Sequence, residues 1–216
     1  MAEVYLRQSP LDHLSLDARA AAEPGEAGVI AGERRFTAKV NLRGDPGDEV
    51  FVKAAKTALK FFVPAAPNTV DGKRERYALW LGPDEWLVVD APGTEAKLVA
   101  DLRKALDGLH AGVTDVTDGR TVIRLNGPNV RDVLAKGCAL DLHPRAFGPA
   151  RCAQTRLAKA TVILHQLDAQ TFDVYIERSF ADYLWRWIED AGQEYGFAIV
   201  AEPVMAMLKR RRRART

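Results

Sequence analysis

Two adjacent carboxylates, Asp84 and Glu85, stand at the centre of the segment YALWLGPDEWLVV. A pair of carboxylates can perform general acid–base catalysis when both side chains converge on one substrate and their pKa values differ. Neighbours in sequence point in different directions when the second of them begins a strand. Pro83 sets φ for a turn, and Trp80 and Trp86 bring large apolar area to the flanking runs. The pair is therefore expected to form the corner of a hairpin.

The other residues that can carry chemistry form no recognised catalytic or metal-binding pattern. Asp115 and the Asp118-Gly119 pair lie in DVTDGRT, which is typical of a turn whose carboxylates accept backbone hydrogen bonds. The four histidines are scattered, and His165, in an apolar run, is expected to be a satisfied core residue. The sequence has no GxGxxG after its first strand and no GxxxxGK, HExxH or CxxC motif. We expect no catalytic, cofactor-binding or metal-binding residue on this chain.

Composition favours a folded chain with a large core. With 216 residues, 47% of them hydrophobic, the chain can form one large domain or two tightly packed small ones. No apolar run is long enough for a membrane span, and the N-terminus carries acids and lacks the apolar core of a signal peptide. A cytoplasmic protein without a membrane partner is expected. Cys138 and Cys152 are too few for a disulfide framework and are expected to be reduced.

Charge is distributed unevenly along the chain. The net charge is +2, but the last eight residues, KRRRRART, hold six basic side chains. Without those six the body carries about −4, which disfavours nucleic-acid binding by the folded part. Residues 206–216 are expected to be a disordered basic tail, and contact of the tail with RNA or anionic lipid stays open.

Hydrophobic periodicity predicts alternating strands and helices after an irregular first segment. Asp48, Thr94 and Ser179 are the expected helix N-caps. Strands are expected at 34–44, 77–81, 85–91, 111–117, 120–127, 152–158, 161–167, 171–178 and 198–204, with helices at 49–62, 95–109, 128–136 and 179–196.

This order indicates an α+β fold built from two βαββαβ-type halves. The first half is expected at 34–117 and the second at 118–205. They follow the irregular segment 1–33 and precede the tail 206–216.

Trp185 stands apart from the apolar stripe of the last helix. At about 100° per residue, the stripe contains Phe180, Leu184, Trp187, Ile188, Ala191 and Tyr195. Trp185 projects outside it, beside Ala181 and Gly192. Because exposed aromatic residues are enriched where proteins associate, Trp185 is expected to contact a partner subunit or a neighbouring loop. The alternative is that the chain covers this helix on two sides itself, with its N-terminal segment as one cover.

Several long segments resemble the gamma subunit of heterotetrameric sarcosine oxidase. They are LWLGPDEWLVV, DVTDGRTVIRLNGPNVRDVLAKGCALDLHP, FGPARCAQTRLA, FDVYIERSFADYLWRWIEDAG and QEYG, in the order of that family. The N-terminal RQSPLDH, LRG and PAAPNTV fit as well, so the resemblance extends to about residue 203. It implies a fold similar to the aminomethyltransferase T-protein and its folate-binding relatives, packed as one unit.

The resemblance also implies a function within a complex. Such complexes oxidatively demethylate sarcosine to glycine, reduce oxygen to hydrogen peroxide and form 5,10-methylenetetrahydrofolate. Partner subunits alpha, beta and delta are expected to hold FAD, FMN, NAD, zinc and tetrahydrofolate, and this chain would be accessory. Two alternatives remain: the equivalent subunit of N-methylglutamate dehydrogenase, and a lone folate-binding one-carbon protein.

Overall fold

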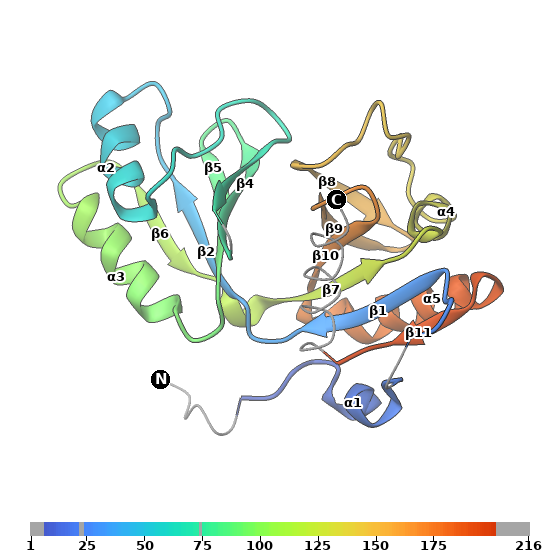
Figure 1. Ribbon diagram of the computed structural model, residues 1–216. Helices are drawn as coiled ribbons and strands as arrows, with labels where there is room; N and C mark the ends of the chain where they lie inside the picture. Colours follow the sequence, from blue (N-terminus) through green and yellow to red (C-terminus); the bar gives the residue numbers. More distant parts are fainter. Residues whose placement is uncertain (1–6, 22–23, 74, 202–216) are drawn as a thin grey trace.

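The computed structural model of the chain describes residues 7–21, 24–73 and 75–201, and the predicted basic tail 206–216 lies outside them. Two β-sheets with helices on their outer faces make up the fold (Figure 1). The predicted α+β class is therefore confirmed.

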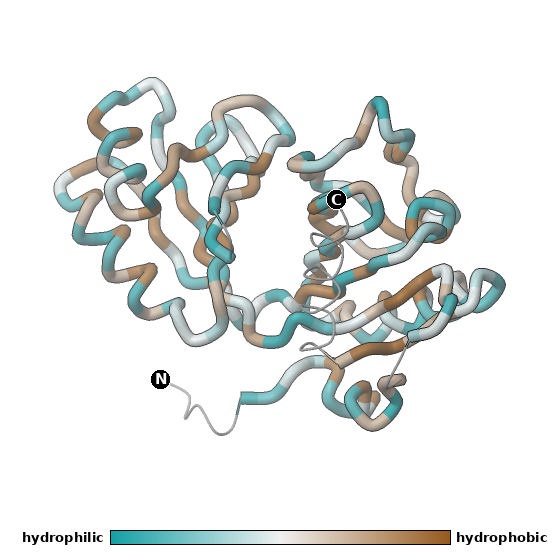
Figure 2. The backbone as a smooth tube through the Cα atoms, viewed as in Figure 1, coloured by the Kyte–Doolittle hydropathy of each residue, from teal (hydrophilic) through white to brown (hydrophobic). Residues whose placement is uncertain are grey.

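The five-stranded sheet has the strand order β3-β4-β5-β2-β6. Its strands are β2 (Ala38–Arg43), β3 (Val70–Lys73), β4 (Arg76–Gly82), β5 (Glu85–Asp90) and β6 (Gly112–Asp115), all antiparallel to their neighbours. Helices α2 (Glu49–Leu59) and α3 (Glu95–Ala105) cover one face (Figure 1). Hydrophilic and hydrophobic residues alternate along both helices, as expected when one side of a helix packs on a sheet (Figure 2).

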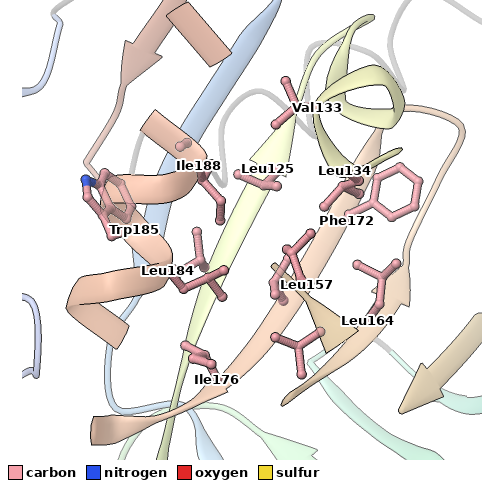
Figure 3. Packing of buried hydrophobic residues seen from close by; sticks show 14 of the residues in the cluster. Leu125, Val133, Leu134, Leu157, Leu164, Phe172, Ile176, Leu184, Trp185 and Ile188 are labelled. Carbon is pink, nitrogen blue, oxygen red and sulfur yellow. The ribbon is translucent and has the colours of Figure 1, made fainter. Parts of the chain in front are cut away.

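The six-stranded sheet has the order β11-β1-β7-β10-β9-β8. Its strands are β1 (Val29–Arg34), β7 (Arg120–Asn126), β8 (Arg151–Leu157), β9 (Ala160–Gln166), β10 (Thr171–Glu177) and β11 (Phe197–Ile199). Helices α4 (Val130–Ala135) and α5 (Ala181–Gly192) pack on one face, where Leu184 and Ile188 point toward Leu125 of β7 (Figure 3). A short helix, α1 (Leu16–Arg19), joins the same apolar core through Leu16.

A third apolar cluster lies between the two sheets. It joins side chains of β4 and β5 to side chains of β7, β8, β9 and β10. The members are Tyr77, Leu79, Leu81, Leu87, Val89, Val122, Cys152, Ile163 and Tyr175. Each sheet thus has a helix-covered face and a face turned toward the other sheet.

The predicted irregular segment 1–33 is wrong at its end, because β1 covers Val29–Arg34. All six residues of β1 are buried, so VIAGER lacks the alternation that marks a half-exposed strand. Burial of Glu33 is possible because Ser9 and Thr121 both donate hydrogen bonds to its carboxylate. The N-terminal part of the chain therefore supplies a strand to the sheet made by residues 120–199.

Asp48 is confirmed as a helix cap, Thr94 occupies the N-cap position of α3 without a side-chain capping bond, and the prediction for Ser179 is wrong. The Asp48 side chain accepts a hydrogen bond from the Val50 amide at 2.8 Å. Thr94 instead donates its hydroxyl to the carbonyl oxygen of Ala91. Ser179 lies within a 3-10 turn, Arg178–Phe180, that leads directly into α5. Short polar side chains next to a helix start also have turn carbonyls within reach, and at Thr94 the Ala91 carbonyl takes the hydroxyl.

Candidate functional site

A buried ion cluster lies on the face of the six-stranded sheet that is turned toward the other sheet. Asp173 of β10 and Arg124 of β7 are directly paired across the strands. The Arg124 Nε and Nη2 atoms donate to the two Asp173 carboxylate oxygens at 2.6 and 2.7 Å. Arg34, the last residue of β1, donates from Nη1 to Asp173 at 3.1 Å. Two guanidinium groups therefore share one fully buried carboxylate.

Two tyrosines extend this cluster across to the five-stranded sheet. Arg34 Nη1 also donates to the hydroxyl of Tyr77 on β4 at 3.2 Å. The hydroxyl oxygens of Tyr77 and Tyr175 lie 2.7 Å apart. The Tyr77 ring packs against the ring of His165 at a centroid distance of 5.2 Å. The ion cluster and its tyrosines therefore link β1, β7, β9 and β10 of one sheet to β4 of the other.

Ionisation states in the cluster follow from burial and from the paired charges. Burial disfavours the charged form of Asp173, but attraction by Arg124 and Arg34 outweighs it and holds the pKa of Asp173 well below its usual range. Burial also opposes the charge of Arg34, yet the Asp173 carboxylate raises the pKa of that guanidinium. Burial raises the pKa of Tyr77 and of Tyr175. At neutral pH these groups keep their ordinary ionisation, which suits a structural link between sheets better than proton transfer.

Lys39 of β2 is a buried group whose pKa is shifted toward neutral pH. Its side chain is almost fully buried, and Nζ donates to the carbonyl oxygen of Thr37. Burial, followed by repulsion from Arg7, lowers the pKa of Lys39 to about 8. Arg7 is itself held by Asp118 at 2.7 Å and by Glu95 at 2.9 Å. A lysine with such a pKa can act as a base or nucleophile where a substrate reaches it, but 1% exposure leaves this amine no open approach.

The carboxylates Asp84 and Glu85 lie at a hairpin corner, as predicted. Strand β4 ends at Gly82 and β5 begins at Glu85. Asp84 pairs with Arg43 at 3.0 Å, whereas Glu85 accepts a hydrogen bond from Asn41 Nδ2 at 2.7 Å. The two side chains therefore serve different partners and do not converge on one point.

Asp115 and the two cysteines also have structural surroundings. The Asp115 carboxylate accepts a hydrogen bond from the Thr117 amide at 2.9 Å, as expected for a turn. Both cysteines are free thiols. Burial raises the pKa of Cys152 to about 12, and its thiol lies 3.4 Å from the carbonyl oxygen of Thr69. Such a thiol is a poor nucleophile at neutral pH.

Trp185 is buried within the chain, so the expectation that its ring contacts a partner instead of the core is wrong. Its exposed fraction is 0%, and its Nε1 donates to Glu189 at 3.2 Å. The ring does point to a different side of α5 from Leu184 and Ile188 (Figure 3). That side is covered by the chain itself, since the ring of Phe197 on β11 meets the Trp185 ring edge-on at 6.4 Å. Trp185 lies outside the main apolar stripe of α5 and is thus buried against β11.

Sequence reasoning missed Arg34, Arg124, Asp173 and Lys39. A detectable signal was present for Asp173 and Arg124, because each is a charged residue in the middle of its strand with apolar residues directly before and after it. Charged residues are rarely fully buried unless they are paired, so two such strands predict a buried ion pair. No comparable signal marks Lys39, whose strand alternates as a half-exposed strand would.

Residues 7–21, 24–73 and 75–201 provide neither a metal-binding cluster nor a membrane-spanning helix. Within them no group of three or more His, Cys, Asp or Glu side chains is placed to hold a metal ion. No helix in those ranges is long and apolar enough to cross a membrane. A hollow of about 740 Å³ lies where the two sheets join, lined by Pro10, Val116, Gly119, Arg120, Glu177, Arg178 and Ser179.

Comparisons with known proteins match most of the chain to one family. The family model described as "Sarcosine oxidase, gamma subunit family" matches residues 43–194. A sarcosine oxidase subunit gamma from Corynebacterium sp. (strain U-96) is 37% identical over 197 residues, which are 91% of this chain and 95% of that relative. A subunit gamma from Arthrobacter sp. is also 37% identical, over 198 residues.

Solved structures agree with these relatives. A chain of the heterotetrameric sarcosine oxidase from Corynebacterium sp. U-96 matches with a TM-score of 0.80 and 36% identity, over 91% of this chain and 100% of that one. The aminomethyltransferase T of the glycine cleavage system from Bartonella henselae matches with a TM-score of 0.68 at 15% identity. That match covers 90% of this chain but 59% of the transferase, and it shows a shared fold.

Proposed function

The chain belongs to the sarcosine oxidase gamma subunit family, and on that premise we propose that it is the accessory subunit of a heterotetrameric sarcosine oxidase. The observation that carries the proposal is likeness over nearly the whole length, 91% of this chain and 95% of the Corynebacterium relative. The solved relative comes from an assembly described as heterotetrameric. The proposed partners are the alpha, beta and delta subunits.

The interior of the chain supports an accessory role. The two sheets face each other, and the facing surfaces are filled by apolar side chains and the ion cluster of Arg34, Arg124 and Asp173. Asp173 pairs with both arginines inside the six-stranded sheet, and Arg34 also pairs with Glu75 and donates to Tyr77 of β4, so these charges are already committed within the chain. We propose that FAD, FMN, NAD, zinc and tetrahydrofolate bind to the other subunits, and that the isolated chain is colourless and does not turn over sarcosine.

The proposed reaction of the whole complex is oxidative demethylation of sarcosine to glycine. Oxygen would be reduced to hydrogen peroxide, and the released one-carbon unit would become 5,10-methylenetetrahydrofolate. A cytoplasmic location fits these reactants.

Purification from the native host tests the proposal. The chain would carry an affinity tag, and the proteins that co-elute would be identified and assayed with sarcosine and with N-methylglutamate. We expect three further subunits, flavin absorbance in the complex and hydrogen peroxide formed from sarcosine. Faster turnover of N-methylglutamate without oxygen consumption would assign the complex to N-methylglutamate dehydrogenase instead. Stoichiometric flavin absorbance on the partner-free chain would contradict the accessory role.

A further inference from the structure

The outer side of α2 and the turn after it expose apolar side chains. Val50, in the first turn of the helix, is 60% exposed, and Phe62 is 48% exposed. Helix α2 ends at Leu59, and Lys60 adopts a left-handed conformation with φ of 72°. The next residue, Phe61, is buried at 6% exposure, whereas Phe62 points outward. The reversal after the helix thus presents a large aromatic ring at the surface.

Phe62 borders a groove of about 530 Å³, here called the α2 groove. Its lining residues are Pro46, Glu49, Val52, Lys53, Lys56, Thr57 and Phe62. The Lys56 ammonium lies 4.0 Å from the centroid of the Phe62 ring, so a cation and an aromatic face are presented together. In Figure 1, α2 and α3 lie on the side of the five-stranded sheet that is turned away from the six-stranded sheet. The α2 groove is therefore remote from the contact between the sheets.

The charge around the α2 groove is mainly positive. Lys53 is paired with Glu49 at 2.7 Å, which leaves that pair neutral. Lys56, whose ammonium lies over the Phe62 ring, therefore gives the lining of the groove a net positive charge. The rest of the chain before the basic tail carries a net negative charge, so the groove differs in sign from the body around it.

We propose that the α2 groove is a docking surface for another subunit of the oxidase, and that the docking segment places an apolar side chain beside acidic ones. The apolar side chain would pack on Phe62 and Val52, and an acidic group would pair with Lys56. An aromatic centre with a charged rim is the usual anatomy of a protein interface. This inference rests on the proposed function, because it takes its occupant from the heterotetramer.

The groove also has a continuation that gives it the extent of an interface. A specific interface covers about 800 Å² per partner, more than one short groove supplies. A second hollow, of about 680 Å³, shares Pro46 with the α2 groove. It is lined by Arg43, Gly44, Asp45, Pro46, Pro83, Asp84, His110, Ala111 and Gly112. A partner segment that follows both hollows would run from α2 to the hairpin corner at Asp84.

The test measures association of the full chain with the other three subunits, purified without it. The variants are Phe62→Asp, which removes the apolar anchor, and Lys56→Glu, which reverses one rim charge. The matched control is Lys104→Glu, the same charge reversal at an exposed lysine of the neighbouring helix α3. We expect Phe62→Asp to weaken binding by about 30-fold or more, the usual effect of removing an interface hot spot. Lys104→Glu should change it less than about threefold. Circular dichroism checks that each variant is folded.

Lys56→Glu tests whether the partner segment is acidic, and it leaves the Phe62 side chain in place. Its effect should be larger at low ionic strength, because salt screens exposed charge pairs. If the wild-type chain binds the other subunits and Phe62→Asp binds them with the same affinity, the docking surface is overturned and the proposed function still stands. A weakened Phe62→Asp beside an unaffected Lys56→Glu would overturn the acidic partner. Loss of binding in Lys104→Glu equal to that in the groove variants would overturn the location. Failure of the wild-type chain to bind would overturn the proposed function with it.

Discussion

Replacing Asp173 with asparagine would test how much the ion cluster stabilises the fold. The amide side chain would keep the volume of the carboxylate and one oxygen acceptor, but the charge shared by Arg34 and Arg124 would be lost. Asp173 is fully buried, and the side chains of Arg34 and Arg124 are 7% and 6% exposed. Breaking a buried ion pair typically costs about 3–5 kcal/mol, because an uncompensated charge is left in the interior. Here Arg124 loses its buried carboxylate partner and Arg34 keeps the exposed Glu75 at 3.0 Å, so we expect the Asp173→Asn variant to fall in that range.

The expected loss corresponds to a large fall in melting temperature. For a chain of this size each kcal/mol shifts Tm by about 2–4 °C, so Tm should fall by about 6–20 °C. Thermal and urea unfolding of the isolated chain, followed by circular dichroism, measure it. The matched control is Asp84→Asn, which breaks the exposed pair with Arg43, where the side chains are 54% and 56% exposed. That variant should lose less than about 1 kcal/mol.

Two further measurements separate the charge from the shape of the site. Because the pKa of Asp173 is lower folded than unfolded, its contribution is present above the unfolded pKa and lost as pH falls through the folded one. The gap between wild type and Asp173→Asn should therefore narrow below about pH 4. Replacing Arg34, Arg124 and Asp173 together with Met, Met and Leu should recover most of the loss, since no unpaired charge remains. A Tm for Asp173→Asn within about 2 °C of the Asp84→Asn control would refute the reasoning.

Three other substitutions give distinct outcomes. Changing Asp84 to Asn and Glu85 to Gln together should leave most of the turnover of the assembled complex, and a loss of several orders of magnitude with assembly intact would contradict the corner assignment. Burial lowers the pKa of Lys39 to about 8 from 10.5, so below pH 8 its charge destabilises the folded chain, and the penalty is relieved as pH rises to 10.5. Lys39→Met should therefore raise unfolding free energy by about 2 kcal/mol at pH 7, after allowance for the lost hydrogen bond, with the gain gone near pH 10.5; a gain independent of pH would contradict this. Trp185→Ala should destabilise the isolated chain by about 3–5 kcal/mol in urea unfolding, whereas an unchanged chain with impaired assembly would restore the interface hypothesis.

The regular elements could be predicted from the sequence because their signals are local. Helix α2 shows its Asp48 cap and its apolar spacing within one short segment, and the β4–β5 hairpin shows two apolar runs around Gly82-Pro83-Asp84. Strand β1 could not be recognised in the same way, because its burial depends on β7 and β11, which follow much later in the chain. A strand covered on both faces has no alternation to detect.

The candidate site was less predictable because it is assembled from distant residues. Arg34 and Asp173 are separated by 139 residues, and no local pattern relates them. The burial of Trp185 likewise depends on Phe197, a residue of β11 whose ring meets a different side of α5 from the one that carries Leu184. Helical periodicity identified the side of the helix on which Trp185 lies, but it carries no information about what covers that side. Tertiary contacts decided both features.

The position of β1 within its sheet has a consequence for the order in which the protein is completed during synthesis. All strands of the five-stranded sheet lie between Ala38 and Asp115, so that sheet and α2 can form while the ribosome is still translating the rest. Strand β1 is made earlier but has no partner until β7 emerges, and its other edge is covered only by β11 at Phe197–Ile199. A strand with both edges open invites pairing with other chains. The nascent chain would therefore expose an unfinished sheet beside a finished α2 groove, and a subunit that bound the groove at that stage would join a chain whose own fold was still incomplete.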